Sequence, residues 1–276
     1  MMRHLLAVVI FIVSIATISI GCPKIPFAKG PYSNKQYQLG SARSLTGNIY
    51  ILSCFVSDSN NTWTDAEKMQ IFNKLHNANK WIASHALKYN NRISFSGGNF
   101  GLKEDIKLDY VNYGTGSGNE DINLVSTVLR KIGYAGSLPY YEWAVNTTNC
   151  DNTFVLIFVK GRGVSYAIAY EDKKMNKERY FVEGCVLYSH FSNGILLNES
   201  GIAHEIMHLF GARDLYETFR QKSDREEMAR RFHNSIMHKN LPNINDQIID
   251  ELTAFLIGWH NRPKNWYEKF VYSVSR

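Results

Sequence analysis

The stretch "GIAHEIMHLFGARD", Gly201–Asp214, carries the strongest signal in this 276-residue chain. His204 and His208 stand four positions apart, so on an α-helix their imidazoles lie one turn apart on the same face and can reach one metal ion. Glu205 projects beside them, where it can act on a water molecule held by that ion. The alternative is an ordinary core helix in which the two histidines only line one face.

Gly211 and Asp214 extend this pattern. Gly211 comes three residues after His208, where a glycine can take the left-handed conformation that ends a helix. A chain that turns back at this glycine brings Asp214 towards the two histidines. His204, His208 and Asp214 then offer two nitrogens and one carboxylate oxygen, and the fourth tetrahedral position stays open for water, as a catalytic zinc site requires.

The segment "HEIMHLFGARD" resembles the extended zinc-binding motif of the metzincin peptidases, H-E-x-x-H-x-x-G-x-x-H or D, with the final Asp of the snapalysin-like members. The segment "SIMH", residues 235–238, resembles the Met-turn of these enzymes, and Met237, 29 residues beyond His208, would be the turn methionine beneath the ligands. The resemblance extends from about residue 46 to the C-terminus, where residues 248–259 are placed like the closing helix of the family.

The resemblance implies an α+β fold of the zincin type. A mixed twisted sheet and its helices would form an upper part (46–211), and the third ligand, Met-turn and final helix a lower part (212–276), with the substrate cleft between them. It also implies one catalytic Zn²⁺ ion and hydrolysis of peptide bonds by a zinc-bound water, with Glu205 as general base. Metzincins hold peptides along an edge strand, and residues 163–170 are the candidate, with a plain internal strand as the alternative.

The chain departs from the metzincin pattern next to the Met-turn. Several members carry a tyrosine two residues after the turn methionine, and this chain has Lys239 there. His233 and His238 flank the turn and are spare imidazoles. Either could replace Asp214 as the third ligand, although a turn residue beneath the site usually points the wrong way.

Two other interpretations remain open. A gluzincin would take its third ligand from a glutamate on a later helix, and Glu226 or Glu227 is available. Gly211 argues against this reading, since that class has no need of a helix stop there. The second interpretation is an exported surface or binding protein that keeps the zincin fold without catalysis; such a protein often loses the residue that stands here as Glu205.

The first 21 residues have the layout of a secretory signal peptide, with Arg3 near the start and an apolar run from Leu5 to small residues before Cys22. The run of 16 apolar residues is shorter than the roughly 20 of a membrane-spanning helix. Cys22 stands where a bacterial lipoprotein is lipidated, although Ser19 occupies a place where Leu is usual. We expect an exported, bacterial protein that is secreted, periplasmic or attached to a membrane through a lipidated Cys22.

An exported chain meets an oxidising environment, which favours disulfide formation. Besides Cys22, the chain contains Cys54, Cys150 and Cys185. We expect one disulfide, between Cys150 and Cys185.

The formal net charge is +6, and removal of residues 1–21, which contain one Arg and no other charged residue, leaves +5. This modest balance is typical of a solvated mixed-charge surface, and no run of Lys and Arg interleaved with aromatics indicates nucleic-acid binding. With 45% hydrophobic and 20% charged residues, the chain is expected to form a globular protein. The resemblance to the metzincins implies protein or peptide substrates, and we expect the protein to be a monomer.

Residues 22–45 are polar and predict a tether or arm, followed by a catalytic domain over 46–276. Apolar β-rich residues predict a buried strand over 47–56, and a capping box of Thr64 and Glu67 predicts the start of a long amphipathic helix. The remaining patterns predict strands over 92–98, 105–111, 152–160, 163–171 and 179–190, a glycine turn over 160–163, and helices over 120–134 and 245–259.

Overall fold

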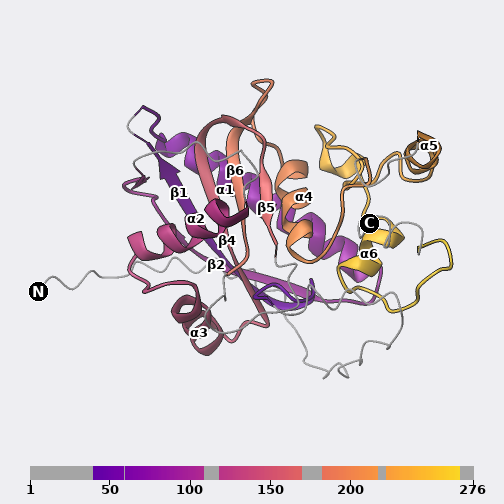
Figure 1. The fold of residues 1–276 in the computed structure, drawn as a ribbon, viewed down its shortest axis with the longest axis horizontal. Coiled ribbons are helices and arrows are strands. Elements are labelled where there is room, and N and C mark those ends of the chain that lie inside the picture. Colours follow the sequence, from indigo (N-terminus) through magenta and orange to yellow (C-terminus); the bar gives the residue numbers. More distant parts are fainter. Residues whose placement is uncertain (1–39, 59, 109–117, 170–181, 217–221, 268–276) are drawn as a thin grey trace, which may run out of the picture.

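A computed structural model describes residues 40–58, 60–108, 118–169, 182–216 and 222–267. Helices and strands alternate in an α+β arrangement (Figure 1). The elements are β1 (Gly47–Ser57), α1 (Asp65–Leu87), β2 (Ile93–Phe100), β3 (Ile106–Lys107), α2 (Gly118–Lys131), α3 (Ser137–Thr148), β4 (Asn152–Gly163), β5 (Tyr166–Ile168), β6 (Gly184–Phe191), α4 (Glu199–Leu209), α5 (Lys222–Arg231), a 3-10 helix (Ile244–Asp246) and α6 (Glu251–Leu256).

The strands form one six-stranded mixed sheet, as the sequence predicted. The order is β2-β1-β4-β6-β5, with β3 beside the end of β1. All the pairings are parallel except that of β5 with β6, which is antiparallel and puts β5 at the edge. The central strands are buried on both faces, which explains why β1 and β4 are nearly continuous apolar runs.

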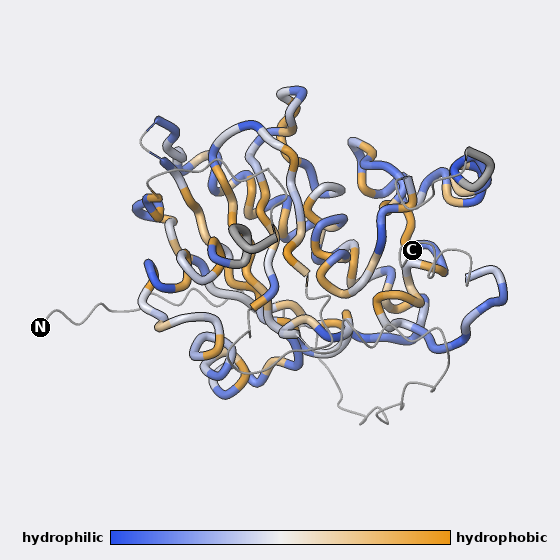
Figure 2. Tube along the Cα trace, viewed as in Figure 1, coloured by the Kyte–Doolittle hydropathy of each residue, from blue (hydrophilic) through white to orange (hydrophobic). Residues whose placement is uncertain are grey.

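Two hydrophobic cores lie on opposite faces of this sheet. Side chains of β1 alternate between them: Ile49 and Ile51 face one core, and Tyr50 and Leu52 the other. The first, the α1/α4-side core, also contains apolar residues of the C-terminal segment, and the second, the α2/α3-side core, is covered by α2 and α3 (Figure 1). Figure 2 shows apolar stretches along the central strands and hydrophilic residues along the outer loops.

Helix α1 begins with the predicted capping box. The backbone N–H of Glu67 donates to the Thr64 hydroxyl at 3.3 Å, and the backbone N–H of Thr64 donates to the Glu67 carboxylate at 3.0 Å. Both N-terminal donors are therefore satisfied by side chains, which stabilises the first turn.

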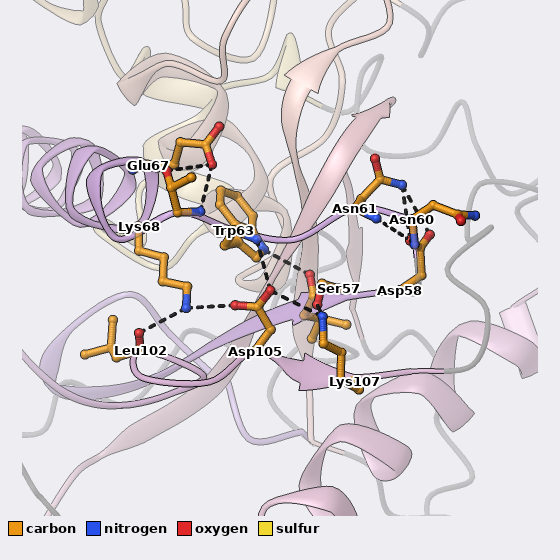
Figure 3. Close-up of polar contacts among 12 residues, drawn as sticks. Ser57, Asp58, Asn60, Asn61, Trp63, Glu67, Lys68, Leu102, Asp105 and Lys107 are labelled. Atoms are coloured by element: carbon orange, nitrogen blue, oxygen red, sulfur yellow. Dashed lines mark hydrogen bonds and ion pairs between the residues drawn. The ribbon is translucent and has the colours of Figure 1, made fainter.

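A buried ion pair joins the start of α1 to the segment before β3 (Figure 3). Lys68 Nζ lies 2.7 Å from Asp105 Oδ1, and the two side chains are only 4% and 6% exposed. Lys68 also donates to the carbonyl of Leu102 at 3.0 Å, and the backbone N–H of Trp63 donates to Asp105 at 3.0 Å. Each buried charge thus has an opposite charge and a second hydrogen bond.

The expected disulfide between Cys150 and Cys185 is wrong. Both thiols are free and buried, as is that of Cys54. Cys185 faces the α1/α4-side core and Cys150 the α2/α3-side core, so the sheet separates them. Burial raises the pKa of the Cys185 thiol well above its usual value.

Three predicted secondary-structure boundaries also differ. The expected turn over 160–163 is wrong, because β4 continues to Gly163 and β5 pairs with β6. Among the described residues, the strand predicted over 105–111 is limited to Ile106–Lys107, and residues 109–111 lie outside them. The final helix spans only Glu251–Leu256, because the Asp250 side chain caps it and accepts from the backbone N–H groups of Leu252 and Thr253.

The described end of the predicted tether, residues 40–45, packs into the protein. Ala42 and Leu45 are fully buried. The backbone N–H of Ala42 donates to the buried carboxylate of Glu183 at 2.5 Å, and the Leu45 carbonyl accepts from the Trp259 indole at 2.7 Å. These contacts connect the segment before β1 to the start of β6 and to the C-terminal part of the chain.

The signal peptide predicted for residues 1–21 and the candidate lipidation site Cys22 lie outside the described residues. Among the described helices, none combines the length and the apolar character that a membrane span requires. The division into an upper part (46–211) and a lower part (212–276) stays a prediction.

Candidate metal centre

Helix α4 carries the two predicted histidines. It begins at Asn198, whose side chain accepts from the backbone N–H of Gly201 at 2.9 Å. Its apolar side chains, among them Ile202 and Ile206, are fully buried in the α1/α4-side core. The helix is therefore fixed along its length before it reaches the site.

Gly211 ends the helical segment as predicted. Its φ is +98°, a left-handed conformation that favours glycine. The backbone N–H of Ala212 donates to the Met207 carbonyl at 3.1 Å, which satisfies one of the last helical carbonyls. The chain then reverses and brings Asp214 to the histidines.

The ligand atoms of His204, His208 and Asp214 meet at one point. Asp214 Oδ1 lies 3.1 Å from His204 Nε2 and 3.3 Å from His208 Nε2, and the two Nε2 atoms are 3.1 Å apart. Within the described ranges, this is the sole group of three or more His, Cys, Asp or Glu residues whose ligand atoms lie close enough to hold a metal ion.

Backbone carbonyls fix the orientation of both imidazoles. His204 Nδ1 lies 2.9 Å from the carbonyl oxygen of Ile236, and His208 Nδ1 lies 2.8 Å from that of Ala212. A carbonyl can only accept, so each Nδ1 carries a proton and each neutral ring presents the lone pair of Nε2 to the centre. Two lone pairs and a carboxylate oxygen then face one another, an arrangement that only a shared proton or a cation can stabilise.

The electrostatics of the centre agree with this conclusion. Burial alone would lower the pKa of His208, but the hydrogen bond that its protonated ring donates to Asp214 and the charges of Glu205 and Asp214 raise it to about 9. Burial alone would raise the pKa of Asp214, but the contacts of its carboxylate with His204 and His208, which donate to it when they are protonated, hold it far below its usual value. The centre therefore attracts positive charge.

Glu205 is buried next to this centre, with 8% of its surface exposed. Burial raises the pKa of its carboxyl group, the charges of His204 and His208 oppose the rise, and the charge of Asp214 adds to it. A raised pKa brings a carboxyl group closer to the range in which it can both accept and donate a proton near neutral pH.

The segment predicted to be a Met-turn lies next to the candidate centre. Met237 is fully buried in the α1/α4-side core, and its carbonyl accepts from the backbone N–H of Leu215 at 2.8 Å, next to Asp214. The preceding residue, Ile236, supplies the carbonyl that holds His204. The turn thus contacts both sides of the candidate centre.

The alternative ligands lie elsewhere. His233 and His238 do not join the His204, His208 and Asp214 group, nor do Glu226 and Glu227 on α5. His238 instead lines a surface hollow of about 440 Å³ with Tyr216, Arg225, Glu226 and Ala229. Among the described residues, the structure therefore brings Asp214 to the histidine pair and leaves the alternatives outside.

The strand proposed for substrate binding lies at the sheet edge. Its described part includes β5, Tyr166–Ile168, whereas Tyr170 lies outside the described residues. Ala167 packs against the α1/α4-side core, and Ile168 faces the opposite core. In Figure 1, β5 is the strand beside α4, so the edge of the sheet borders the metal-binding helix.

The residues that orient the two histidines and hold the turn were not predicted from the sequence. The carbonyls of Ile236 and Ala212 carry no signal in their side chains, and Ser235 and Asp250, which hold the turn, were not singled out. The one available signal was an N-cap pattern, an Asp directly before the apolar run of the closing helix.

Comparisons with known proteins show a distant similarity to a solved structure and none to a known sequence. No protein family matches the chain, and no curated protein sequence matches it. Among solved structures, the chain is similar to metalloproteinase-II from Bacteroides fragilis, with 10% sequence identity, a TM-score of 0.33, and coverage of 81% of this chain and 59% of that chain. The chain thus spans less than two thirds of that protein. A similarity this loose does not define a family, and the function of the chain has to be inferred from the centre itself.

Proposed function

We propose that this protein is an exported zinc endopeptidase of the metzincin type. The observation that carries the proposal is the convergence of His204 Nε2, His208 Nε2 and Asp214 Oδ1, with both Nδ1 atoms held by carbonyls and Glu205 buried beside them. Three protein ligands, with carbonyls that hold the two imidazoles, suit a catalytic zinc site rather than a closed structural one.

The donor set fits zinc among the common metals. Two imidazole nitrogens and one carboxylate oxygen suit Zn²⁺, whereas Ca²⁺ and Mg²⁺ take oxygen ligands. Three protein ligands leave one tetrahedral position for water or substrate, as in other catalytic zinc sites. We therefore propose one catalytic Zn²⁺ ion, held by His204, His208 and Asp214.

The proposed reaction is the hydrolysis of a peptide bond. When bound, the zinc ion supplies Lewis-acid activation of a water molecule and of the substrate carbonyl. Glu205 would take the proton from that water and pass it to the leaving amine, first as general base and then as general acid. Its buried position next to the histidines supports this role.

We propose that the substrate is a protein or peptide that adds a strand to the edge of the sheet. As the last strand of the described sheet, β5 beside α4 would offer main-chain donors and acceptors to an extended chain. A cleft between an upper part (46–211) and a lower part (212–276) would receive that chain. We further propose that the signal peptide exports the protein, that a lipidated Cys22 attaches it to a membrane, and that it acts as a monomer.

The rival proposal is an exported binding protein that holds zinc without catalysis. A matched pair of variants separates the two: Glu205→Gln removes the proposed base, and Glu199→Gln makes the same change six residues earlier on α4, away from the ligands. Casein hydrolysis is measured for both variants and for the unmodified protein, with and without a chelator.

We expect Glu205→Gln to lose at least about 100-fold in activity while binding zinc stoichiometrically, because general acid–base catalysis contributes about 10²- to 10⁴-fold. Glu199→Gln should retain activity, and the chelator should abolish it. Stoichiometric zinc in the unmodified protein, with no cleavage across a broad peptide library, would establish the binding protein instead.

A further inference from the structure

The two histidines of the candidate centre are supported in different ways. His208 is held by the carbonyl of Ala212, four residues along the chain and just past the helix stop. His204 is held by the carbonyl of Ile236, 32 residues away. The orientation of His204 therefore depends on whatever keeps the segment around Ile236 in place.

A buried serine holds that segment. The Ser235 hydroxyl donates to Asp250 Oδ2 at 2.6 Å and accepts from the backbone N–H of Met237 at 3.2 Å. It thus connects to the backbone on the far side of Ile236. Two backbone hydrogen bonds add to this restraint: the N–H of Ile236 donates to the carbonyl of Ile248 at 3.0 Å, and the N–H of Ile248 donates to the carbonyl of Asn234 at 2.9 Å.

Asp250 anchors the serine. Its Oδ1 accepts from the backbone N–H groups of Leu252 and Thr253 at 3.0 Å each, and its Oδ2 accepts from the hydroxyls of Ser235 and Thr253 at 2.6 Å each. Asp250 is 4% exposed and Ser235 is fully buried. Four donors in a site without solvent leave the carboxylate with a single orientation.

We propose that Asp250 and Ser235 are positioning residues for the metal ligand His204, acting through the Ile236 carbonyl. This inference rests on the proposed metal centre. The path runs from the Asp250 carboxylate to the Ser235 hydroxyl, through the 235–237 backbone to the Ile236 carbonyl, and from there to His204 Nδ1. Outer-shell partners of this kind set the tautomer and the direction of the ligating nitrogen.

The structure contains a matched control. Thr253 donates a buried hydroxyl to the same oxygen of Asp250 at the same distance as Ser235, but it has no bond to the turn. Ser235→Ala and Thr253→Val therefore remove equivalent hydrogen bonds from one carboxylate, and only the first interrupts the path to His204. Both variants should lose folding stability, and Ser235→Ala the more of the two, because it also removes the acceptor of the Met237 backbone N–H.

The experiment measures zinc affinity by competition with a chelator, and the visible absorption spectrum after replacement of zinc by Co²⁺, on the full chain. We expect Ser235→Ala to bind zinc about 10- to 100-fold more weakly and to change the Co²⁺ spectrum. Thr253→Val should keep the affinity within about twofold of the unmodified protein, and Ser235→Thr, which retains the hydroxyl, should recover most of the loss.

Equal zinc affinities in Ser235→Ala and Thr253→Val, or an equal decrease in both, would overturn the positioning role and leave a purely structural one. If Ser235→Ala does not fold, Asp250→Asn provides the test, since an asparagine still caps α6 but presents an NH₂ group in place of one carboxylate oxygen. The expectation for Asp250→Asn is the same weakening of zinc binding. Absence of zinc binding in the unmodified protein would instead overturn the proposed function, and this inference with it.

Discussion

Two buried polar groups of this protein differ in what they require. Around Asp105, every interaction joins a donor to an acceptor: Lys68 and the backbone N–H of Trp63 both donate to the carboxylate (Figure 3). Around Asp214, the imidazoles of His204 and His208 have used their Nδ1 protons on carbonyls and present acceptors to an acceptor. The charges of the first group are satisfied by contacts within the chain, whereas the three ligand atoms of the second are stabilised by a proton or a cation between them.

The Lys68–Asp105 ion pair has a structural role, whereas the group of His204, His208 and Asp214 has the properties of a binding site. A buried ion pair that satisfies itself contributes to the fold and needs no partner. A group of buried acceptors lowers stability unless something positive binds to it, and such an arrangement persists where binding has a use. Metal should therefore affect one of these groups and leave the other unchanged.

The largest effect is expected at the complete pair. Lys68→Met leaves Asp105 buried without its opposite charge, which should cost about 3–5 kcal/mol in the free energy of unfolding. Urea denaturation measures the loss, which should be the same with and without zinc. Lys107→Met is the control, because that lysine is 56% exposed and 3.8 Å from Asp105, so its loss should cost less than about 1 kcal/mol. Equal losses in both variants would contradict the assignment of Lys68 as the essential partner.

The second effect concerns the group of His204, His208 and Asp214. Zinc at 1,000 times its dissociation constant should raise the free energy of unfolding by about 4 kcal/mol. Asp214→Ala should weaken zinc binding more than about 100-fold, beyond the range of outer-shell changes, and so remove most of this stabilisation. Asp246→Ala is the control, because it removes an exposed carboxylate that is not part of the centre, and the stabilisation by zinc should stay unchanged. Unchanged zinc affinity in Asp214→Ala would exclude Asp214 as a ligand.

A third test uses pH. Burial alone would raise the pKa of Asp105, but hydrogen bonds from Lys68, Trp63 and Ser57 lower it below its usual value. A folded-state pKa below the unfolded one stabilises the fold above about pH 4, and this stabilisation is lost as the pH falls through the folded value. Asp105→Asn should therefore be less stable than the unmodified protein at pH 5, and this difference in the free energy of unfolding should become smaller as the pH falls to about 2. Urea denaturation at each pH measures the difference. A difference that stays constant over this range would contradict the lowered pKa.

The smallest effect is expected at the capping box beside the ion pair. Thr64→Ala removes the side-chain acceptor at the start of α1 and should cost about 1 kcal/mol, measured by thermal denaturation. Zinc affinity should not change, since α1 supplies no ligand. A change in zinc affinity would show that the two regions are coupled.

The sequence predicted those features whose physical cause is local. Thr64 and Glu67 are three residues apart, and the capping box formed as expected. Gly211 ended its helix, and the spacing of His204, His208 and Asp214 was enough to predict that they meet. The apolar β-rich runs of β1 and β4 predicted strands, and that of β1 a buried one, though not their order in the sheet.

Features that depend on distant parts of the chain were not predictable. The sheet face on which a cysteine lies depends on strand pairing, and this is why Cys150 and Cys185 were paired wrongly. The continuation of β4 to Gly163 follows from its partner β6, not from the glycines within it. The bond between Ser235 and Asp250 arises because the turn and the final helix meet in three dimensions, and the two residue types carry no pattern that announces it.

The buried residues before β1 set a limit on where this protein can act. Leu45 is hydrogen-bonded to Trp259 and Ala42 to Glu183, so the described part of the chain is held in place close to its first residue, Gly40. A lipid on Cys22 would lie 18 residues from that point, and a fully extended chain of this length spans at most about 65 Å. An anchored molecule would then work within a shell of that depth above the membrane, and its substrates would be neighbours on the same surface or chains that pass close to it.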